Sequence, residues 1–421
     1  MAKVLVIGSG GREHALCYKF AQSPYVEQVY VANGNGGMDD VATLVDIDIL
    51  DFEGLIAFAK ENKIDLTFVG PEIPLCAGIS DAFQKAGLSI FGPTQAASQL
   101  EGSKCFAKDM MHKYNIPTAK YASFDDYEKA SVYLSNQKCP IVLKADGLAA
   151  GKGVIIATTM EEAQKSLKDM MCNDLFKEAG TSLVIEEYLE GEEFSLFAFV
   201  NGKDVYPMQI AQDHKRAFDH DQGLNTGGMG AYTPVAHLPQ SAVDEAMEKV
   251  MKPIAEAMVL EGMPYQGILY GGFMLTDEGV KTIEFNCRFG DPESEVVLQA
   301  MTSDLYQTIM DVMDHKEPVI TFSKEAFLGV VLAAEGYPQS YQKNIDLSDL
   351  KLTSPACFHM GTKKTDKGLV SSGGRVLFIS QSAPTLKEAK QKTYALIDEI
   401  KREGLFYRSD IGDRELSKET D

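Results

Sequence analysis

The stretch KADGLAAGKGV, from Lys144 to Val154, decides which fold this chain is predicted to adopt, because it places lysines in a loop of small residues suited to phosphate. A Walker A loop, G-x-x-x-x-G-K-[ST], is excluded, because three residues rather than four separate Gly147 from Gly151 and because Gly153 follows Lys152. The small residues instead predict a β-turn-β flap that folds over a triphosphate with little steric hindrance. A surface hairpin with two solvated lysines is the less favoured alternative.

The residues around this loop predict a lid-sized subdomain and then a larger, mainly antiparallel sheet. Strands PIVLKA, GVIIAT and SLVIEEYL, with a helix opened by the capping box Thr159–Glu162, occupy about residues 121–189. The hairpin EFSLFAFVNGKDVYPMQI turns at Asn201–Gly202, and a helix near 241–261 precedes the paired strands GILYGGFMLT and VKTIEFN.

Each end of the chain predicts one further domain. Strands KVLVIG, QVYVAN, IDLTFVG and LSIFG alternate with amphipathic stretches, which is typical of a parallel α/β domain. The strands LGVVLAA, ACFHMG and RVLFIS and a last helix near 385–402 predict a small α/β domain at the other end. The predicted division is an N-terminal substrate-binding domain over 1–102, a central domain over 103–325 and a C-terminal domain over 326–421.

Composition and charge limit the classes of partner. The 421 residues carry a formal net charge of -21, which argues against a nucleic-acid surface and against attraction to anionic membrane. The seven cysteines form no C-x-x-C pair, which suits a reducing cytoplasm and disfavours structural zinc. Neither a signal peptide nor a membrane-spanning segment is expected.

The loop GSGGREHA, Gly8 to Ala15, follows the first predicted strand and opens a helix. Backbone N–H groups at such a turn face an anion, and the helix dipole favours negative charge there. The dinucleotide pattern G-x-G-x-x-G is not met, because Glu13 takes the place of the third glycine, so a nicotinamide dehydrogenase is disfavoured. A tight turn that needs glycine for geometry alone, with Arg12 and His14 as ordinary first-turn residues, stays open.

The motif IEFNCRFGDPE predicts a site for a hard cation. Side chains two apart on a strand share a face, so Glu284 and Asn286 point together while Phe285 points into the core. Magnesium favours such an oxygen pair completed by phosphates and water, and Arg288 follows on the same side as a fork for a carboxylate. The alternative is a weak surface ion pair between Glu284 and Arg288.

The stretch from Gln212 to Val235 is predicted to be a long loop without strand or helix. It gathers histidines, aspartates and basic residues before a glycine-rich turn, and an ordered loop of this length is usually functional. His214 and His220 lack any cysteine pair, so they are interpreted as polar loop residues rather than zinc ligands.

Together these motifs resemble those of ATP-grasp ligases, and closely those of the phosphoribosylamine–glycine ligases, also called glycinamide ribonucleotide synthetases. The resemblance covers essentially the whole chain and depends on the order of its motifs: GSGGREHA, KADGLAAGKGV, EEYLEGEE, QDHKR with NTGGMGAY, and EFNCRFGDPE. It implies a three-domain enzyme of purine biosynthesis whose central domain is an ATP-grasp domain, with ATP between the lid and the antiparallel sheet. It also implies Mg²⁺ or Mn²⁺, and we expect a monomer.

The resemblance assigns roles to individual residues. The nucleotide would be bound by phosphate-contacting lysines, flap residues, an adenine hinge and a ribose contact, which are Lys104, Lys144, Gly151, Lys152, Gly153, Glu186, Glu187, Leu189 and Glu193. The metal ligands would be Glu284 and Asn286. The catalytic residues would be Arg288, Lys144 and Asp213, and the substrates would also meet Gly10, Gly11, Gly228 and Arg375.

The implied reaction joins glycine to 5-phosphoribosylamine and cleaves ATP to ADP and phosphate. Glycine would first be phosphorylated to glycyl phosphate, with catalysis by positioning and charge neutralisation rather than by a covalent nucleophile. His220 and Leu224 depart from the glycine and proline usual in the family, and no second carboxylate ligand is evident. Another ATP-grasp ligase or carboxylase, such as a biotin carboxylase or a D-alanine ligase, is the alternative, and a nucleotide-binding regulator is a weaker one.

Overall fold

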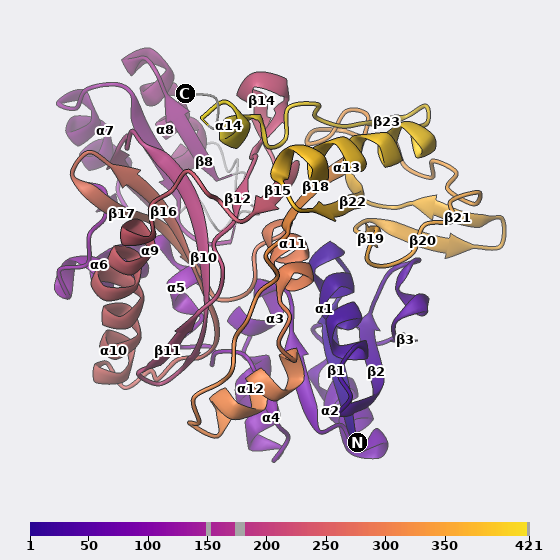
Figure 1. Cartoon of the computed structure of the whole chain (residues 1–421). Helices are drawn as coiled ribbons and strands as arrows, with labels where there is room; N and C mark the ends of the chain where they lie inside the picture. Colours follow the sequence, from indigo (N-terminus) through magenta and orange to yellow (C-terminus); the bar gives the residue numbers. More distant parts are fainter. Residues whose placement is uncertain (149–152, 173–181, 419–421) are drawn as a thin grey trace.

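The N-terminal domain is built on a five-stranded sheet in which every pair of neighbours is parallel, in the order β3-β2-β1-β4-β5 (Figure 1). A computed structural model describes residues 1–148, 153–172 and 182–418 of the chain. The run Val4–Ile7 is fully buried, as expected of a central parallel strand covered on both faces. The elements are β1 Ala2–Gly8, α1 Gly11–Ala21, β2 Val26–Asn33, η1 Met38–Asp40, β3 Thr43–Val45, α2 Phe52–Asn62, β4 Leu66–Val69, α3 Glu72–Cys76, α4 Ile79–Lys85 and β5 Ile90–Phe91.

The lid is a four-stranded antiparallel sheet, in the order β6-β9-β7-β8, with two helices. Its buried side chains, among them Leu134, Leu143 and Leu167, form a core separate from the rest of the molecule. The predicted capping box is present in shifted form, because the Glu162 carboxylate accepts from the backbone N–H of Thr158. The elements are β6 Tyr121–Phe124, α7 Tyr127–Ser135, β7 Ile141–Ala145, β8 Val154–Ala157, α8 Met160–Cys172 and β9 Leu183–Glu187.

The larger sheet of the central domain is antiparallel in the order β11-β10-β16-β17, as predicted. Ser103 caps α6 by accepting from the N–H of Phe106 at 3.1 Å. The hairpin loop is Gly202–Lys203, one residue later than predicted, and Gly202 has φ +61°. The elements are α5 Gln99–Gly102, α6 Lys104–Lys113, β10 Glu192–Asn201, β11 Asp204–Pro207, α9 Gln240–Ala246, the π-helical turn Met247–Met251, α10 Lys252–Leu260, β16 Gln266–Thr276 and β17 Gly279–Asn286.

The C-terminal sheet corrects the prediction that residues 212–235 lack regular structure. Strand β15 from that stretch pairs antiparallel with β18 near the middle of the sheet, whose order is β12-β15-β18-β22-β19, and a ribbon formed by β13 and β14 lies beside it. The signal was missed because these strands have two to four residues and include glycines, so their pairing depends on a distant partner. The strands are β12 Gln212–Asp213, β13 Arg216–Phe218, β14 Gln222–Asn225, β15 Gly230–Thr233, β18 Ala326–Ala334, β19 Cys357–His359, β20 Thr362–Thr365, β21 Gly368–Ser371, β22 Arg375–Ala383 and β23 Leu405–Phe406.

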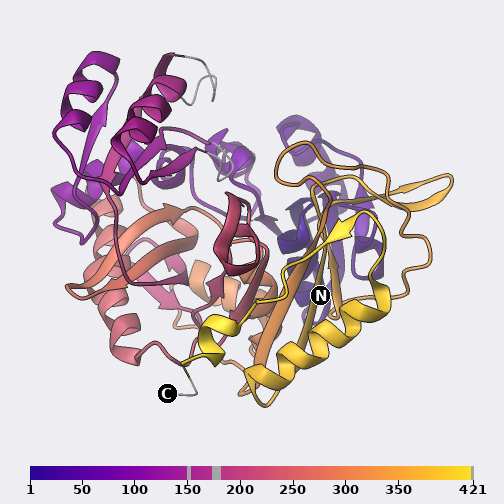
Figure 2. The same ribbon diagram turned by 90° about the horizontal axis from the view of Figure 1, so that it is seen from above.

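The helices that follow the central sheet connect the C-terminal sheet to the other domains. The long helix α13 covers the sheet along one side, while α11 packs between α1 and the strands β15 and β18 (Figures 1 and 2). Figure 2 shows the lid helices on the opposite side of the molecule from α13. The helices are α11 Glu293–Ala300, α12 Leu305–Met313, α13 Leu386–Ile400 and α14 Asp413–Leu416, with the 3-10 turn η3 Asp219–Asp221.

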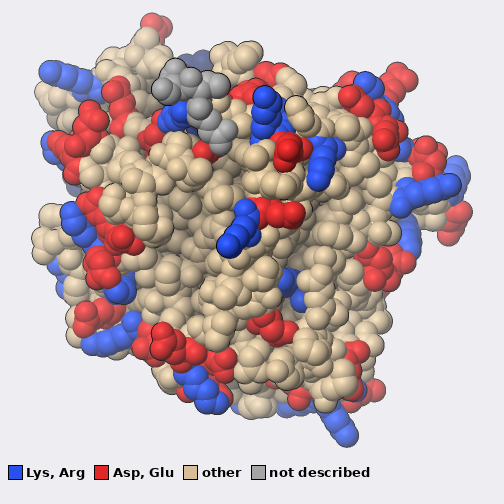
Figure 3. Space-filling view, viewed as in Figure 1, with Lys and Arg blue, Asp and Glu red and all other residues tan. Residues whose placement is uncertain are grey.

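The surface carries mixed charge on the face drawn in Figure 3, where acidic and basic side chains alternate around the rim. Within the described ranges, no helix combines the length and apolar character needed to cross a membrane.

Candidate active site

A buried carboxylate on the lid holds two lysines. Glu186, near the end of β9, forms ion pairs with Lys108 Nζ at 3.1 Å and with Lys144 Nζ at 3.0 Å. Lys144 also donates to the carbonyl oxygen of Ile283 at 3.0 Å, which connects the lid to β17. Burial lowers the pKa of Lys108 to about 8, although Glu186 opposes the shift. The predicted phosphate lysine Lys144 is thus held beside the strand that carries the predicted metal ligands.

The other predicted nucleotide residues surround this cluster. Lys104 donates to the carbonyl oxygen of Gly147 at 3.1 Å, which joins α6 to the base of the flap. Glu187 accepts from the N–H of Lys120 at 2.9 Å, and Leu189 is half-buried just after it. Gly153 is buried at the start of β8. The predicted residues Gly151 and Lys152 lie outside the described residues.

Lys215 joins two of the predicted residues and was not itself predicted. Its ammonium group forms ion pairs with Glu193 on β10 and, at 3.0 Å, with Asp213 on β12. Burial alone would lower the pKa of Lys215, but Asp213 and Glu193 outweigh it and raise the pKa well above its usual value. Lys215 lies two residues after Asp213 in the quoted motif QDHKR, so the period of a strand could have indicated it.

Glu284 and Asn286 form an oxygen donor pair that fits a hard cation. Both lie on β17, opposite Gly272 and Tyr270 of β16, and Phe285 between them is buried in the core as predicted. Among the described residues, none forms a hydrogen bond or close ion pair with the Glu284 carboxylate. Burial would raise its pKa, yet Lys144, Lys215 and Lys104 together lower it, so the carboxylate is charged. A negative, uncompensated oxygen beside an amide oxygen is the donor chemistry that Mg²⁺ and Mn²⁺ prefer.

Arg288 is fixed by carboxylates from outside the central sheet. It donates from Nη2 to Glu101 at 2.7 Å and from Nε to Glu72 at 3.2 Å, and Nη2 also lies 3.3 Å from Asn286 Oδ1. The predicted proximity to Asn286 is therefore present, whereas a surface pair with Glu284 is not formed among the described contacts. Glu72 and Glu101 were missed because neither lies in a recognisable motif.

Three predicted substrate residues meet at Asp291. Arg375 lies 2.9 Å from Asp291 Oδ1 and donates to the carbonyl oxygens of Gly227 and Asp291 at 2.8 and 2.9 Å. A methyl group on Gly10 would come within 3.2 Å of Asp291 Oδ2, and one on Gly228 within 3.5 Å of the Asp291 carbonyl oxygen. The structure thus brings the first domain, the glycine-rich turn and the C-terminal sheet to a single carboxylate.

The GSGGREHA turn differs from the predicted phosphate cradle. The N–H of Gly10 donates to the Glu13 carboxylate at 2.6 Å, so this N–H is not free for a phosphate as we expected. Gly11 faces another carboxylate, since a methyl group there would come within 2.6 Å of Glu295 Oε1. Arg12 and His14 are buried rather than ordinary first-turn residues: Arg12 donates to Phe289, and His14 accepts from the N–H of His359.

His214 is also not the polar loop residue that the sequence indicated. It is 2% exposed, and burial lowers its pKa to about 3, so the ring is neutral. No group of three or more His, Cys, Asp or Glu side chains is arranged to hold a metal in the described part of the chain. This is consistent with a metal site that depends on an asparagine and on bound phosphates.

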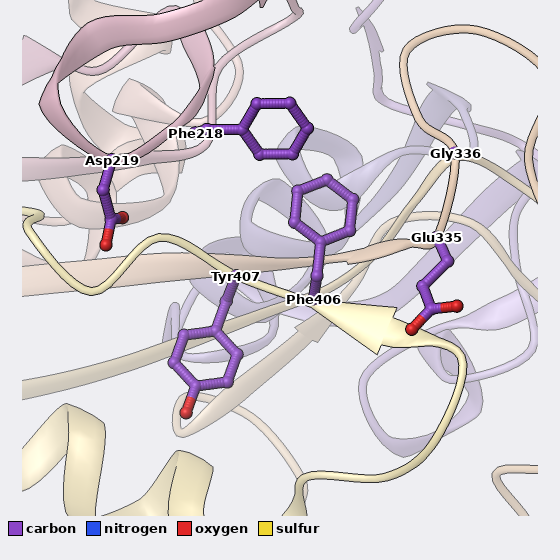
Figure 4. A pocket seen from close by; sticks show the side chains of 6 residues that line it. All are labelled: Phe218, Asp219, Glu335, Gly336, Phe406 and Tyr407. Carbon is purple, nitrogen blue, oxygen red and sulfur yellow. The ribbon is translucent and has the colours of Figure 1, made fainter.

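A surface cavity of about 470 Å³ lies away from all the predicted site residues. It is lined by Phe218, Asp219, Glu335, Gly336, Phe406 and Tyr407, and the rings of Phe218 and Phe406 face each other with centroids 5.6 Å apart (Figure 4). It opens between the β13–β14 ribbon and the edge of the C-terminal sheet. The lysines and the metal-ligand pair described above are absent from its lining, so it is not the candidate active site.

The lid, the antiparallel sheet facing it and the lysines and oxygen ligands between them define an ATP-grasp enzyme. Profiles of the phosphoribosylglycinamide synthetase N domain, ATP-grasp (A) domain and C domain match residues 2–101, 102–294 and 327–414. The chain belongs to the phosphoribosylglycinamide synthetase family, whose members are also called phosphoribosylamine–glycine ligases. The predicted fold class, with a parallel N-terminal domain, a central ATP-grasp domain and a C-terminal domain, is confirmed.

Similar proteins span the whole chain. The phosphoribosylamine–glycine ligase of Halalkalibacterium halodurans is 53% identical over 99% of this chain and 97% of its own length. That of Streptococcus pyogenes serotype M18 is 51% identical over 98% and 99%. The crystal structure of the Thermotoga maritima phosphoribosylamine–glycine ligase superposes with a TM-score of 0.85 at 32% identity, covering 98% of this chain and all of that one. A biotin carboxylase from Campylobacter jejuni, at 14% identity and a TM-score of 0.76, shares the fold.

Proposed function

We propose that this protein catalyses the ATP-dependent ligation of glycine to 5-phosphoribosylamine, giving glycinamide ribonucleotide, ADP and phosphate in de novo purine biosynthesis. The observation that carries the proposal is that Lys144, paired with Glu186, donates to the carbonyl oxygen of Ile283, the residue directly before Glu284. Membership of the phosphoribosylglycinamide synthetase family supports the choice of substrates.

ATP is proposed to lie between the lid and the sheet β11-β10-β16-β17. Lys104 and Lys144 contact its phosphates, with Gly151, Lys152 and Gly153 in the covering flap. Glu186, Glu187 and Leu189 line the adenine, and Glu193 meets the ribose. Because Lys108 and Lys144 neutralise the buried Glu186 carboxylate, the adenine would meet the backbone of this strand end rather than a free charge.

Glu284 and Asn286 are proposed to hold Mg²⁺ or Mn²⁺, completed by phosphate oxygens and water. A bound cation there supplies charge stabilisation to the phosphates during transfer. The charged, otherwise uncompensated state of Glu284 supports this assignment.

Glycine activation is proposed to occur next to this pair. A carboxylate is a poor electrophile, so glycine is phosphorylated to glycyl phosphate before the amine attacks. Arg288 orients the glycine carboxylate and steadies the transferring phosphoryl group, Lys144 neutralises developing charge, and Asp213 lines the glycine side. Since Glu72 and Glu101 already occupy much of the Arg288 fork, we expect it to offer glycine a single N–H rather than a bidentate grip.

Phosphoribosylamine is proposed to lie against Gly10, Gly11, Gly228 and Arg375. The convergence of these residues from three parts of the chain supports a substrate position there. We also propose a monomer, and a cytoplasmic location because the seven free cysteines suit a reducing compartment. A particle near 46.1 kDa in size-exclusion chromatography with light scattering would support the monomer, and a dimer mass would contradict it.

A coupled assay of ADP release, with each substrate omitted in turn, tests the function. We expect release that requires glycine and freshly prepared phosphoribosylamine together. Release that is indifferent to glycine, or that bicarbonate or D-alanine supports instead, would point to another ATP-grasp ligase or carboxylase.

A further inference from the structure

The segment that begins at Asn286 carries one carboxylate, Asp291, to which the proposed phosphoryl transfer assigns no role. Asn286 and Arg288 lie at its beginning, and Asp291 follows three residues later with a side chain that is 13% exposed. Asp291 therefore directly follows the residues proposed to activate glycine, and a substrate can reach it.

The hydrogen-bonding state of Asp291 leaves an acceptor open. Arg375 Nη1 lies 2.9 Å from Oδ1, which is fully buried and therefore out of a substrate's reach. The other oxygen, Oδ2, faces Gly10 and accepts no hydrogen bond from the described residues, so it is the acceptor that a substrate can reach. The same nitrogen, Nη1 of Arg375, donates to the backbone oxygens of Gly227 and Asp291. The arginine thus fixes the segment and balances its charge, while the carboxylate keeps capacity to accept an N–H.

A second carboxylate, Glu295, interacts electrostatically with Asp291. It is fully buried in α11, and its Oε1 likewise accepts no hydrogen bond from the described residues. Burial, and then repulsion by Asp291, raises the pKa of Glu295 well above its usual value. Two like charges close together in a buried site cannot both ionise without cost, so the neutral form of Glu295 is favoured.

The neighbours of Asp291 indicate which end of a sugar substrate it would meet. A carboxylate facing Gly10 repels a phosphate and attracts an amine, and the Gly10 N–H is already bonded to Glu13. Gly10 and Gly228 pack closely against this segment: a methyl group on Gly10 would come within 3.2 Å of Asp291 Oδ2, and one on Gly228 within 2.4 Å of Pro292 Cδ.

We propose that Asp291 is the catalytic base that takes the proton from the amine of phosphoribosylamine as that amine attacks glycyl phosphate. The nitrogen lone pair forms the new N–C bond, and the carbonyl electron pair moves to oxygen. Asp291 accepts one proton from the nitrogen. The electron pair on oxygen then re-forms the carbonyl as the C–O bond to phosphate breaks with its electron pair on the leaving phosphate, and the proton passes from Asp291 to water. This inference rests on the proposed function, because the electrophile that the amine attacks is glycyl phosphate.

The test separates the two chemical steps in single-turnover rapid quench, with the full chain in excess over ATP, glycine and freshly made phosphoribosylamine. In Asp291→Asn we expect ADP formation within about threefold of the original rate and amide formation slower by about 100-fold or more, the contribution of a positioned base. Asp291→Glu, which restores a carboxylate, should recover most of that loss. Asp349→Asn is the control, because Asp349 pairs with Arg402 at 2.7 Å far from the site and should change neither step.

Three outcomes overturn the proposal. Equal slowing of both steps in Asp291→Asn would show that Asp291 acts before the amine attacks, and amide formation within about threefold of the original would show that no base is needed there. If Asp291→Asn fails to fold, Asp291→Glu provides the test. In that variant, amide formation slower by about 100-fold with ADP formation intact would exclude a role for Asp291 as a simple proton acceptor. ADP release by the unchanged protein without glycine would instead remove the proposed function itself.

Discussion

At the scale of single residues, most carboxylates of the candidate site are paired with a cation. The paired carboxylates and their partners are Glu186 with Lys108 and Lys144, Asp213 with Lys215, Glu101 with Arg288 and Asp291 with Arg375. Glu284 and Glu295 have no close cation among the described residues, and neither has Glu293, which accepts from Tyr270 and Ser195 instead. Distant lysines keep Glu284 charged, whereas burial and Asp291 keep Glu295 neutral. These opposite states lead to two predictions.

Glu284→Ala should strongly reduce metal-dependent turnover without unfolding the protein. We expect turnover to fall by about two orders of magnitude, because several kcal/mol of charge stabilisation at the phosphates is lost. The thermal midpoint should not fall, since the carboxylate has no close partner to lose. Steady-state ADP assays at several Mg²⁺ and Mn²⁺ concentrations check this, with Glu278→Ala on the same hairpin, where Glu278 pairs with Lys281, as the control. Near-normal activity in Glu284→Ala would remove the metal assignment.

Glu295→Gln should stabilise the protein increasingly as pH rises. In the unfolded chain a glutamate titrates near 4.3, while burial and Asp291 raise the pKa of Glu295 in the folded state. Above about pH 4.3 the unfolded chain releases a proton that the folded protein retains, so the glutamate costs stability that grows until the raised folded pKa is reached. Glutamine removes this cost.

Thermal unfolding at about pH 5 and about pH 7.5 measures this effect. The midpoint of Glu295→Gln should exceed that of the unchanged protein by more at the higher pH. A difference that stays constant between the two would mean that Glu295 is ionised in the folded protein.

At the scale of elements, the C-terminal segment holds the β13–β14 ribbon next to the site. Arg408 is 1% exposed and donates to Asp410 from two nitrogens at 2.7 Å, to Asp221 at 2.9 Å and to the carbonyl oxygen of Arg216 at 3.1 Å. The ribbon follows Lys215 directly, so its position fixes the lysine that joins Asp213 to Glu193.

Arg408→Met should destabilise the protein and release the ribbon. Removing one partner of a buried ion pair costs about 3–5 kcal/mol, because Asp410 would stay partly buried without its cation. Trypsin should then cleave more quickly after Lys215 or Arg216. Arg402→Met is the matched control, because Arg402 pairs with the exposed Asp349 and should cost about 1 kcal/mol or less. Equal cleavage and equal stability in the two variants would contradict a holding role for Arg408.

The strands show which elements could be predicted from the sequence and which could not. Strands such as β1 and β16 were predicted because long runs of apolar residues specify them locally. The two-residue β12 and the glycine-rich β15 were missed, because pairing with β18 rather than local propensity makes them strands.

At the scale of the whole molecule, the ordered motifs predicted three domains and the family, and the domain boundaries stay predictions. Residues within motifs, such as Lys144, Glu284 and Arg288, could be identified from sequence. Their partners could not: Lys108 lies on α6 and Glu101 on α5, and only folding brings them to the site. Asp291 lies inside a quoted motif, but its role depends on Gly10, Gly228 and Arg375 arriving from three parts of the chain.

The chain is therefore understood as a clamp that activates one substrate's carboxylate and presents it to the other substrate's amine. The most direct test uses glycine labelled with oxygen-18 in its carboxyl group, together with ATP and phosphoribosylamine, and mass spectrometry of the products. We expect one labelled oxygen in the released inorganic phosphate and one retained in the amide carbonyl for each turnover. Unlabelled phosphate, formed alongside labelled amide, would contradict the account.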